Sequence, residues 1–253
     1  MSNTGKALID KEKRVNKAMI FAAGLGTRLK PWTDHHPKAL ALVNGKPLLQ
    51  RNIEYLKSFG VTDIIINVHH FAKQIVEFLA VNNHFNCNIS ISHEEEEPLE
   101  TGGGLKKAGW FLQSSDPFLV INADILTNLN INAMLQFHLQ HKPLITLAVT
   151  NRKASRAFLF NDKGRLSGWR DNRSGVEKIS IPATHTAARA FSGIHMIDPA
   201  VFSLITESGK FSLVDLYLRL AVRETIMCYD HSGDILIDVG KPEAIEQAEQ
   251  YFY

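Results

Sequence analysis

The chain has 253 residues, of which 45% are hydrophobic and 21% charged, and its formal net charge is +2. This composition is too apolar for a disordered chain, and the length is sufficient for one large core. A near-neutral balance without a long basic stripe excludes a typical nucleic-acid binder, and no apolar run approaches the 18 residues of a membrane-spanning helix.

The two cysteines and the first residues indicate where the protein is expected to work. Cys87 and Cys228 are far apart and belong to no CxxC pair, so neither a disulfide framework nor a structural zinc site is expected. Residues 1–16 form a polar leader without the apolar stretch of a secretory signal. We therefore expect a cytoplasmic protein with no membrane segment and one folded domain at 17–253.

In the first half, short apolar runs alternate with amphipathic segments, a pattern that predicts buried parallel strands covered by helices on both faces. The predicted elements are a strand at 18–23, a helix at 47–59, a strand at 64–68, a helix at 71–80, a strand at 87–92, a helix at about 104–113 and a strand at 118–122.

After about residue 143 the pattern changes to short strands separated by turn residues, which predicts an antiparallel addition at one side of the sheet. The predicted elements here are strands at 144–151, 157–161 and 164–169, helices at about 198–206 and 213–223, a strand at 235–239 and a helix at 242–251. The predicted fold is a single α/β domain with a mixed, mostly parallel Rossmann-like central sheet and a small antiparallel addition.

The strongest functional signal is the segment FAAGLGTRLKPWTDHHPKAL at 21–40, which directly follows the first predicted strand. Its glycines allow a sharp turn that brings backbone N–H groups close to a phosphate chain. Arg28 offers a planar fork for phosphate oxygens, and Lys38 offers a movable point charge. Two other glycine loops do not fit, because position 29 is Leu29 where a dinucleotide fingerprint needs glycine, and the segment lacks the GKS or GKT of a Walker A loop.

This segment resembles the GxGxR…PK signature of the nucleotidyltransferases that make nucleoside-diphosphate sugars. The matching residues are Gly24, Gly26, Thr27, Arg28, Pro31, Thr33, Pro37 and Lys38. Within that family, the compact length and the segment EPLETGGG at 97–104 resemble N-acetylmuramate 1-phosphate uridylyltransferases. The resemblance implies a nucleotide-binding part at about 17–142 and a sugar-phosphate-binding part at about 143–240.

Two aspartates end apolar runs far apart in the sequence: Asp124 after 120–123 and Asp238 within 236–240. The resemblance implies that both bind Mg²⁺, which commonly takes one or two carboxylates together with substrate phosphate oxygens. Each aspartate alone could instead be structural, for example as a turn cap. Relatives have glycine where this chain has Ala123 and threonine where it has Lys241.

The resemblance also implies base recognition at 99–104 and sugar binding at 191–194. The alternative at 99–104 is a helix N-terminus capped by Thr101, with glycines that allow close packing. The EEEE run at 94–97 is expected to be a solvated loop. The residues implied for nucleotide binding, in addition to Arg28 and Lys38, are Ala22, Ala23, Gly24, Gly26, Thr27, Glu100, Gly102, Gly103 and Asn122, and those for the sugar are Ser192 and Gly193.

The expected reaction is Mg²⁺-dependent transfer of a nucleotidyl group, with UTP as the expected donor, to a sugar 1-phosphate. It gives an NDP-sugar and pyrophosphate, with Arg28, Lys38, Asp124 and Asp238 as the catalytic residues. No Ser-His-Asp nucleophile is predicted, and the chemistry requires none, because the sugar phosphate itself attacks. The alternatives are a mannose- or heptose-1-phosphate guanylyltransferase, a cytidylyltransferase, or a non-catalytic regulatory protein that binds sugar nucleotides.

Overall fold

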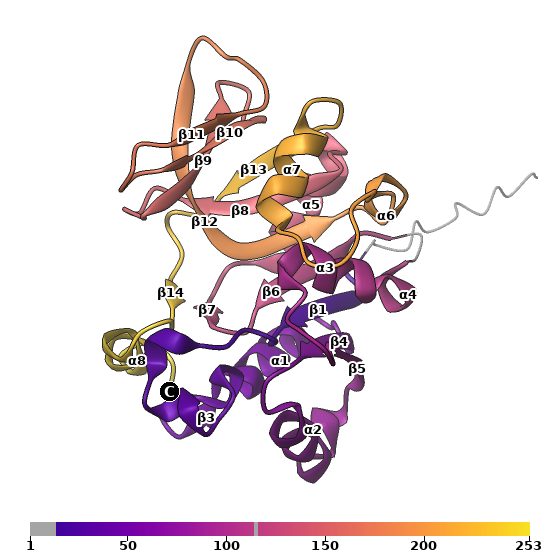
Figure 1. Cartoon of the computed structure of the whole chain (residues 1–253), viewed down its shortest axis with the longest axis vertical. Helices are drawn as coiled ribbons and strands as arrows, with labels where there is room; N and C mark the ends of the chain where they lie inside the picture. Colours follow the sequence, from indigo (N-terminus) through magenta and orange to yellow (C-terminus); the bar gives the residue numbers. More distant parts are fainter. Residues whose placement is uncertain (1–13, 114–115) are drawn as a thin grey trace, which may run out of the picture.

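The computed structural model describes residues 14–113 and 116–253, so positions 1–13 of the expected leader lie outside the described residues. A ten-stranded mixed sheet runs through the protein (Figure 1). One part of this sheet is parallel, in the order β5–β4–β1–β6. Its strands are Asn88–His93, Asp63–Val68, Lys17–Phe21 and Phe118–Asn122.

The long strand β12 (Thr186–Ile197) joins this parallel part to the rest of the sheet. It runs antiparallel to both β6 and β8 (Ile145–Thr150), and β13 (Ile226–Asp230) is parallel to β8. The N-terminal end of β12 pairs instead with the antiparallel ribbon at the top of Figure 1. That ribbon consists of β9 (Arg156–Asn161), β10 (Leu166–Asp171) and β11 (Glu177–Ile179). The predicted mixed, mostly parallel sheet with an antiparallel addition is confirmed.

Helices cover both faces of the sheet because successive residues of its inner strands are buried on opposite sides. In β1, Ala18 and Ile20 join the core beneath one helical layer, whereas Met19 joins the core beneath the other. The first layer consists of α1 (Leu48–Ser58), α2 (Ala72–Val81) and α5 (Ile131–His141). The second consists of α3 (Glu100–Lys107), α4 (Gly109–Leu112), α6 (Val201–Leu204) and α7 (Leu213–Ala221).

A third, smaller core brings the end of the chain against the segment that follows β1. Leu126 and Ile237 come from the antiparallel pair β7 (Ile125–Thr127) and β14 (Leu236–Asp238). They pack in this core with Leu29 and with Ala248 of α8 (Pro242–Glu249). Residues 236–240 are thereby placed beside the glycine loop. The remaining elements are β2 (Leu42–Val43), β3 (Lys46–Pro47), and the short 3-10 helices η1 (Thr27–Leu29), η2 (Trp32–Asp34), η3 (Lys38–Leu40) and η4 (Asn83–Asn86).

The structure differs from the sequence prediction in several elements. The helix expected at about 104–113 begins earlier, at Glu100, and is divided into α3 and α4. The elements that were not predicted include α5, β7, β11, β13 and the N-terminal part of β12. In the part of the chain that the structure describes, no helix is long and apolar enough to cross a membrane.

Candidate functional site

A cleft of about 570 Å³ opens at the carboxyl ends of the parallel strands β1, β4 and β6, where open α/β sheets bind ligands. It is lined by the glycine loop (residues 22–28), by the ends of these strands and by the start of α3. The lining residues are Phe21, Ala22, Ala23, Gly24, Leu25, Gly26, Thr27, Arg28, Lys38, Ala39, Asn67, Glu94, Pro98, Glu100, Thr101, Asn122, Ala123, Asp124 and Lys210.

The glycine loop turns back on itself at Gly26. Its φ of +63° is a conformation that favours glycine, and a Cβ there would lie 2.7 Å from the Cβ of Lys38. The Thr33 hydroxyl donates to the Gly26 carbonyl over 3.0 Å, which holds the following segment against the loop. As a result, Lys38 lies beside the loop although it is twelve positions after Gly26 in the sequence.

Lys38 and Asp124 form a direct ion pair, with side chains that are 13% and 20% exposed. Asp124 follows β6, and its carbonyl oxygen accepts the backbone N–H of Val239 over 2.8 Å. In the same β7–β14 pairing, Asp238 lies opposite Ile125. The structure therefore brings the two predicted aspartates together from positions more than one hundred residues apart. Asp238 lies beside the cleft and is not one of its lining residues.

The charged groups around Asp238 have opposite effects on the pKa of its carboxyl group. The pKa of its carboxyl is raised, first by burial of the group and then by the negative charge of Asp124. The positive charges of Lys38, Arg28 and Arg152 oppose this rise. Gly240 shows that Arg28 and Asp238 are close to each other. A Cβ at this glycine would lie 2.7 Å from Nη2 of Arg28 and 2.8 Å from Oδ1 of Asp238.

The donor set formed by Asp124 and Asp238 fits Mg²⁺. Their two carboxylates repel each other, and a divalent cation between them would relieve that repulsion. In the described ranges, no group of three or more His, Cys, Asp or Glu side chains could hold a metal ion. Two carboxylates with substrate oxygens as further ligands suit Mg²⁺, which seldom uses an all-protein cage.

Sequence reasoning missed a buried chain of hydrogen bonds in the wall of the cleft. The backbone N–H of Ala22 donates to Asn67 Oδ1 over 2.8 Å, and Asn67 Nδ2 donates to Glu94 Oε1 over 2.8 Å. The other carboxylate oxygen of Glu94 accepts the Leu99 N–H over 2.7 Å. Glu94 is only 2% exposed, so the expectation that all of 94–97 is solvated was wrong for its first residue. The available signal was Asn67, a polar residue within an otherwise apolar strand.

The segment expected to be a base-binding turn forms the first part of α3. The N–H groups of Gly102 and Gly103 both point to the Phe211 carbonyl, at 2.9 and 3.3 Å. A Cβ at Gly103 would lie 2.3 Å from the Gly209 carbonyl oxygen, so this glycine permits close packing. Within α3, Glu100 and Thr101 line the cleft, whereas the two glycines are buried behind it.

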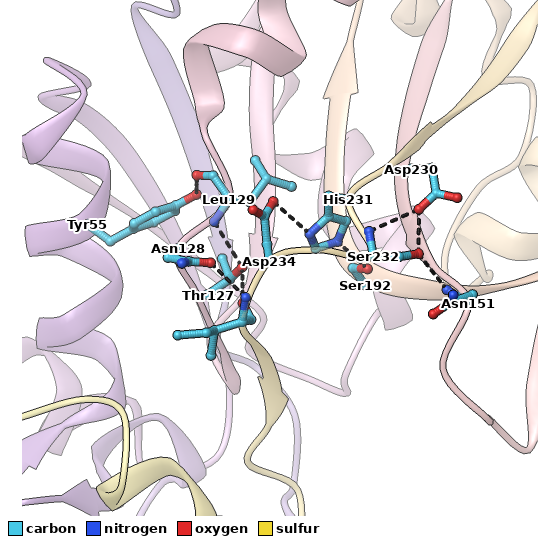
Figure 2. A network of polar contacts seen from close by, with 11 residues as sticks. Tyr55, Thr127, Asn128, Leu129, Asn151, Ser192, Asp230, His231, Ser232 and Asp234 are labelled. Atoms are coloured by element: carbon cyan, nitrogen blue, oxygen red, sulfur yellow. Dashed lines mark hydrogen bonds and ion pairs between the residues drawn. The ribbon is translucent and has the colours of Figure 1, made fainter.

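Ser192 and Gly193, the residues implied for sugar binding, are buried in a bulge of β12. The Ser192 hydroxyl lies 2.7 Å from Nε2 of His231, whose Nδ1 is 3.4 Å from Asp234 Oδ2 (Figure 2). The structure thus contains a Ser-His-Asp alignment that the sequence did not suggest, because its members come from separate segments. Ser192 is completely buried, so this alignment joins β12 to the loop after β13 and is closed to a substrate. A Cβ at Gly193 would lie 2.8 Å from Asn122 Nδ2, which places the bulge against the end of β6.

A glycine loop, two cations and two carboxylates at the ends of parallel strands are typical of α/β proteins that bind polyphosphates. Residues 17–252 match the family model described as Nucleotidyl transferase, and the chain belongs to this family.

Relatives and solved structures agree with this family. The chain is 29% identical to a mannose-1-phosphate guanyltransferase of Yarrowia lipolytica over 233 residues, which are 90% of this chain and 61% of that protein. It is 42% identical to an N-acetylmuramate alpha-1-phosphate uridylyltransferase of Neisseria meningitidis over 120 residues, which are 47% of this chain and 52% of that protein. HddC from Yersinia pseudotuberculosis complexed with GMP-PN superposes with a TM-score of 0.75 at 25% identity, covering 94% of this chain and all of HddC. The chain thus spans about three fifths of the length of the guanyltransferases that it matches.

Proposed function

We propose that this protein transfers a nucleotidyl group from a nucleoside triphosphate to a sugar 1-phosphate. The observation that carries the proposal is the convergence of Arg28, Lys38, Asp124 and Asp238 beside one cleft at the strand ends. Their charges suit a reaction in which polyanions must be held together while negative charge moves to a leaving group. The names of the relatives, which act on sugar 1-phosphates, support the same reaction class.

In the proposed reaction, a phosphate oxygen of the sugar 1-phosphate attacks the α-phosphorus in line. The bond from that phosphorus to the bridging oxygen of the β-phosphate breaks, and pyrophosphate leaves with the electron pair. Arg28 binds the departing phosphates through its planar fork, and Lys38 holds the α-phosphate by its point charge. Gly24 and Gly26 line the cleft, so their backbone N–H groups can orient the triphosphate.

We propose that Asp124 and Asp238 hold Mg²⁺ together with phosphate oxygens of the substrates. When bound, the ion neutralises charge on the reacting phosphates. The ion pair between Lys38 and Asp124 keeps the Lys38 ammonium group and the Asp124 carboxylate within reach of the same phosphate group.

We propose UTP as the preferred donor, with Glu100 and Thr101 as the residues of the α3 segment that contact the base. The support is the 42% identity to a uridylyltransferase, compared with 29% to the guanyltransferase. Guanylyl transfer is the second candidate, because the guanyltransferase match extends over 90% of this chain and the complex of HddC contains GMP-PN. The sugar is proposed to lie near Gly193 and Asn122, at the junction of β12 and β6.

Pyrophosphate release tests the proposal. UTP, GTP, CTP and ATP are each combined with N-acetylmuramate 1-phosphate or mannose 1-phosphate in the presence of Mg²⁺. We expect release with UTP at least about tenfold faster than with CTP, since one mismatched buried polar contact costs about 1–3 kcal/mol. Preference for GTP would establish the second candidate. A chain that binds a UDP-sugar and releases no pyrophosphate would be a sugar-nucleotide-binding regulatory protein.

A further inference from the structure

Arg152 is an exposed cation on the cleft side of the sheet that the sequence did not single out. It follows β8, which ends at Thr150. Because β12 is antiparallel to both β6 and β8, these two strands run in the same direction. Arg152 and Asp124 therefore both follow the carboxyl ends of their strands, at the same end of the sheet. The strand β12 lies between β8, which precedes Arg152, and β6, which precedes Asp124.

Two hydrogen bonds restrain the backbone and side chain around Arg152. Its Nη2 donates to the Phe191 carbonyl over 3.0 Å. The N–H of the preceding Asn151 donates to Ser232 Oγ over 2.9 Å, and Ser232 is in turn bonded to Asp230, as Figure 2 shows. Within the described part of the chain, no carboxylate lies within 4.0 Å of the Arg152 guanidinium. Most of its donor fork is thus available to an anion.

The same contacts connect Arg152 to the proposed reaction centre. Phe191, which accepts the bond from Arg152, directly precedes the β12 bulge. In that bulge, a Cβ at Gly193 would lie 2.8 Å from both Asn122 Nδ2 and Ile125 Cγ1, on either side of Asp124. Arg152 is thus connected, through its hydrogen bond to Phe191 and the β12 bulge, to the strand end that carries Asp124.

We propose that Arg152 binds the phosphate of the acceptor, the sugar 1-phosphate, and directs its oxygen toward the α-phosphorus. This assignment rests on the proposed function and extends it to the acceptor side. The nucleotide side already has Arg28 and Lys38, both of which line the cleft, whereas Arg152 does not line it. An exposed guanidinium with an open fork is suited to bidentate binding of a phosphate, and lysine does not reproduce that geometry.

The test compares Arg152→Gln and Arg152→Lys with the matched control Arg156→Gln. Arg156 is an exposed arginine four positions later, whose Nε lies 3.7 Å from Asp171 in the antiparallel ribbon. The assay measures pyrophosphate release with the preferred triphosphate and either N-acetylmuramate 1-phosphate or mannose 1-phosphate. For Arg152→Gln we expect a rise of about tenfold or more in KM for the sugar phosphate, the scale of one charge-assisted contact. KM for the triphosphate should stay within about twofold, Arg152→Lys should recover only part of the loss, and the control should match wild type.

Calorimetric titration of the same two sugar phosphates onto the wild type and Arg152→Gln separates this proposal from the proposed function. Loss of sugar-phosphate binding in Arg152→Gln supports the proposal, even for a wild-type chain that releases no pyrophosphate, in which case the proposed function alone fails. Equal binding and equal KM in wild type and Arg152→Gln would overturn the role of Arg152. A wild type that binds neither sugar phosphate, or a KM increase confined to the triphosphate, would overturn it as well.

Discussion

The backbone N–H of Val239 donates to the carbonyl oxygen of Asp124 over 2.8 Å, and this bond aligns two distant parts of the chain. Through it, the short strands β7 and β14 bring Asp238 next to the carboxylate that follows β6. The packing of Leu126 and Ile237 in the small third core stabilises this pairing. A carboxylate pair is thus assembled by backbone pairing and apolar burial, without a direct bond between the two side chains.

We predict that Asp124→Asn and Asp238→Asn each reduce turnover at least about 10²-fold, the scale of losing one major electrostatic contact in a transition state. Neither change should alter the fold, because both residues follow or end strands whose backbone pairing is retained. The measurement is the initial rate of pyrophosphate release at limiting Mg²⁺, with thermal melting as the control for folding. Near-normal rates in either variant would exclude the two-aspartate site.

Arg28 and Lys38 are predicted to have separable roles. Arg28→Ala should raise KM for the triphosphate, and Arg28→Lys should recover only part of that loss because the planar fork is absent. Lys38→Ala should mainly lower kcat, because Lys38 lies against Asp124 at the proposed reaction centre. Steady-state kinetics with each substrate varied in turn distinguishes the two effects. Full turnover by Lys38→Ala at saturating substrates would show that Lys38 does not act on the α-phosphate.

Asn67→Ala is predicted to destabilise the protein. It removes both partners that Asn67 provides, leaving the Ala22 N–H and one oxygen of Glu94 buried without their bonds. The expected loss is about 1–3 kcal/mol of unfolding free energy for a buried polar group that loses its partner. Urea unfolding measures it, with Asn88→Ala as the control, since Asn88 makes an exposed bond to Asp63. Equal stability of the two variants would mean that the hydrogen bonds of Asn67 in the cleft wall contribute little to the stability of the protein.

Buried His138 should make the protein less stable in acid. Burial lowers the pKa of His138 from 6.5 to about 4, although the charge of Asp198 opposes this shift. Between these two values the unfolded chain binds the proton and the folded chain does not, so stability decreases as the pH falls from about 6.5 to 4. The contribution of this one group is about 3 kcal/mol over the full range.

His138→Gln should therefore flatten the dependence of unfolding free energy on pH in that range. Buried His195, whose pKa is lowered to about 3 by burial, keeps a slope of the same sign in the variant. Urea unfolding at several pH values between 4 and 7 provides the comparison. An identical slope in wild type and His138→Gln would contradict the assignment.

The sequence pattern predicted the elements that bury a continuous apolar face, such as β1, β4 and β6. It missed α5, although Ile131, Met134, Leu135 and His138 have helical spacing, because polar residues dilute that stripe. It also missed the first part of β12, whose residues are small and mostly exposed. In these elements, pairing with strands distant in the sequence determines the structure, and local composition carries little of that information.

In the candidate site, too, some residues can be predicted from the local sequence, whereas others depend on tertiary contacts. The glycine loop and the two strand-end aspartates are visible in the sequence because each follows a recognisable apolar run. Glu94 and Arg152 are not visible, since the burial of one and the open guanidinium of the other depend on tertiary contacts. The three glycines at 102–104 were open to two interpretations, and only the packing of α3 against residues 209–211 shows how closely the backbone approaches there.

The most direct test of nucleotidyl transfer follows labelled phosphorus through the reaction. Wild-type protein is incubated with Mg²⁺, an accepted sugar 1-phosphate and UTP labelled at either the α- or the γ-phosphorus. We predict that the α-label appears in a UDP-sugar and the γ-label in pyrophosphate, with both transfers lost in Asp124→Asn. Transfer of the γ-label to the sugar phosphate, or release of the γ-label as inorganic phosphate without formation of a UDP-sugar, would contradict the proposed function.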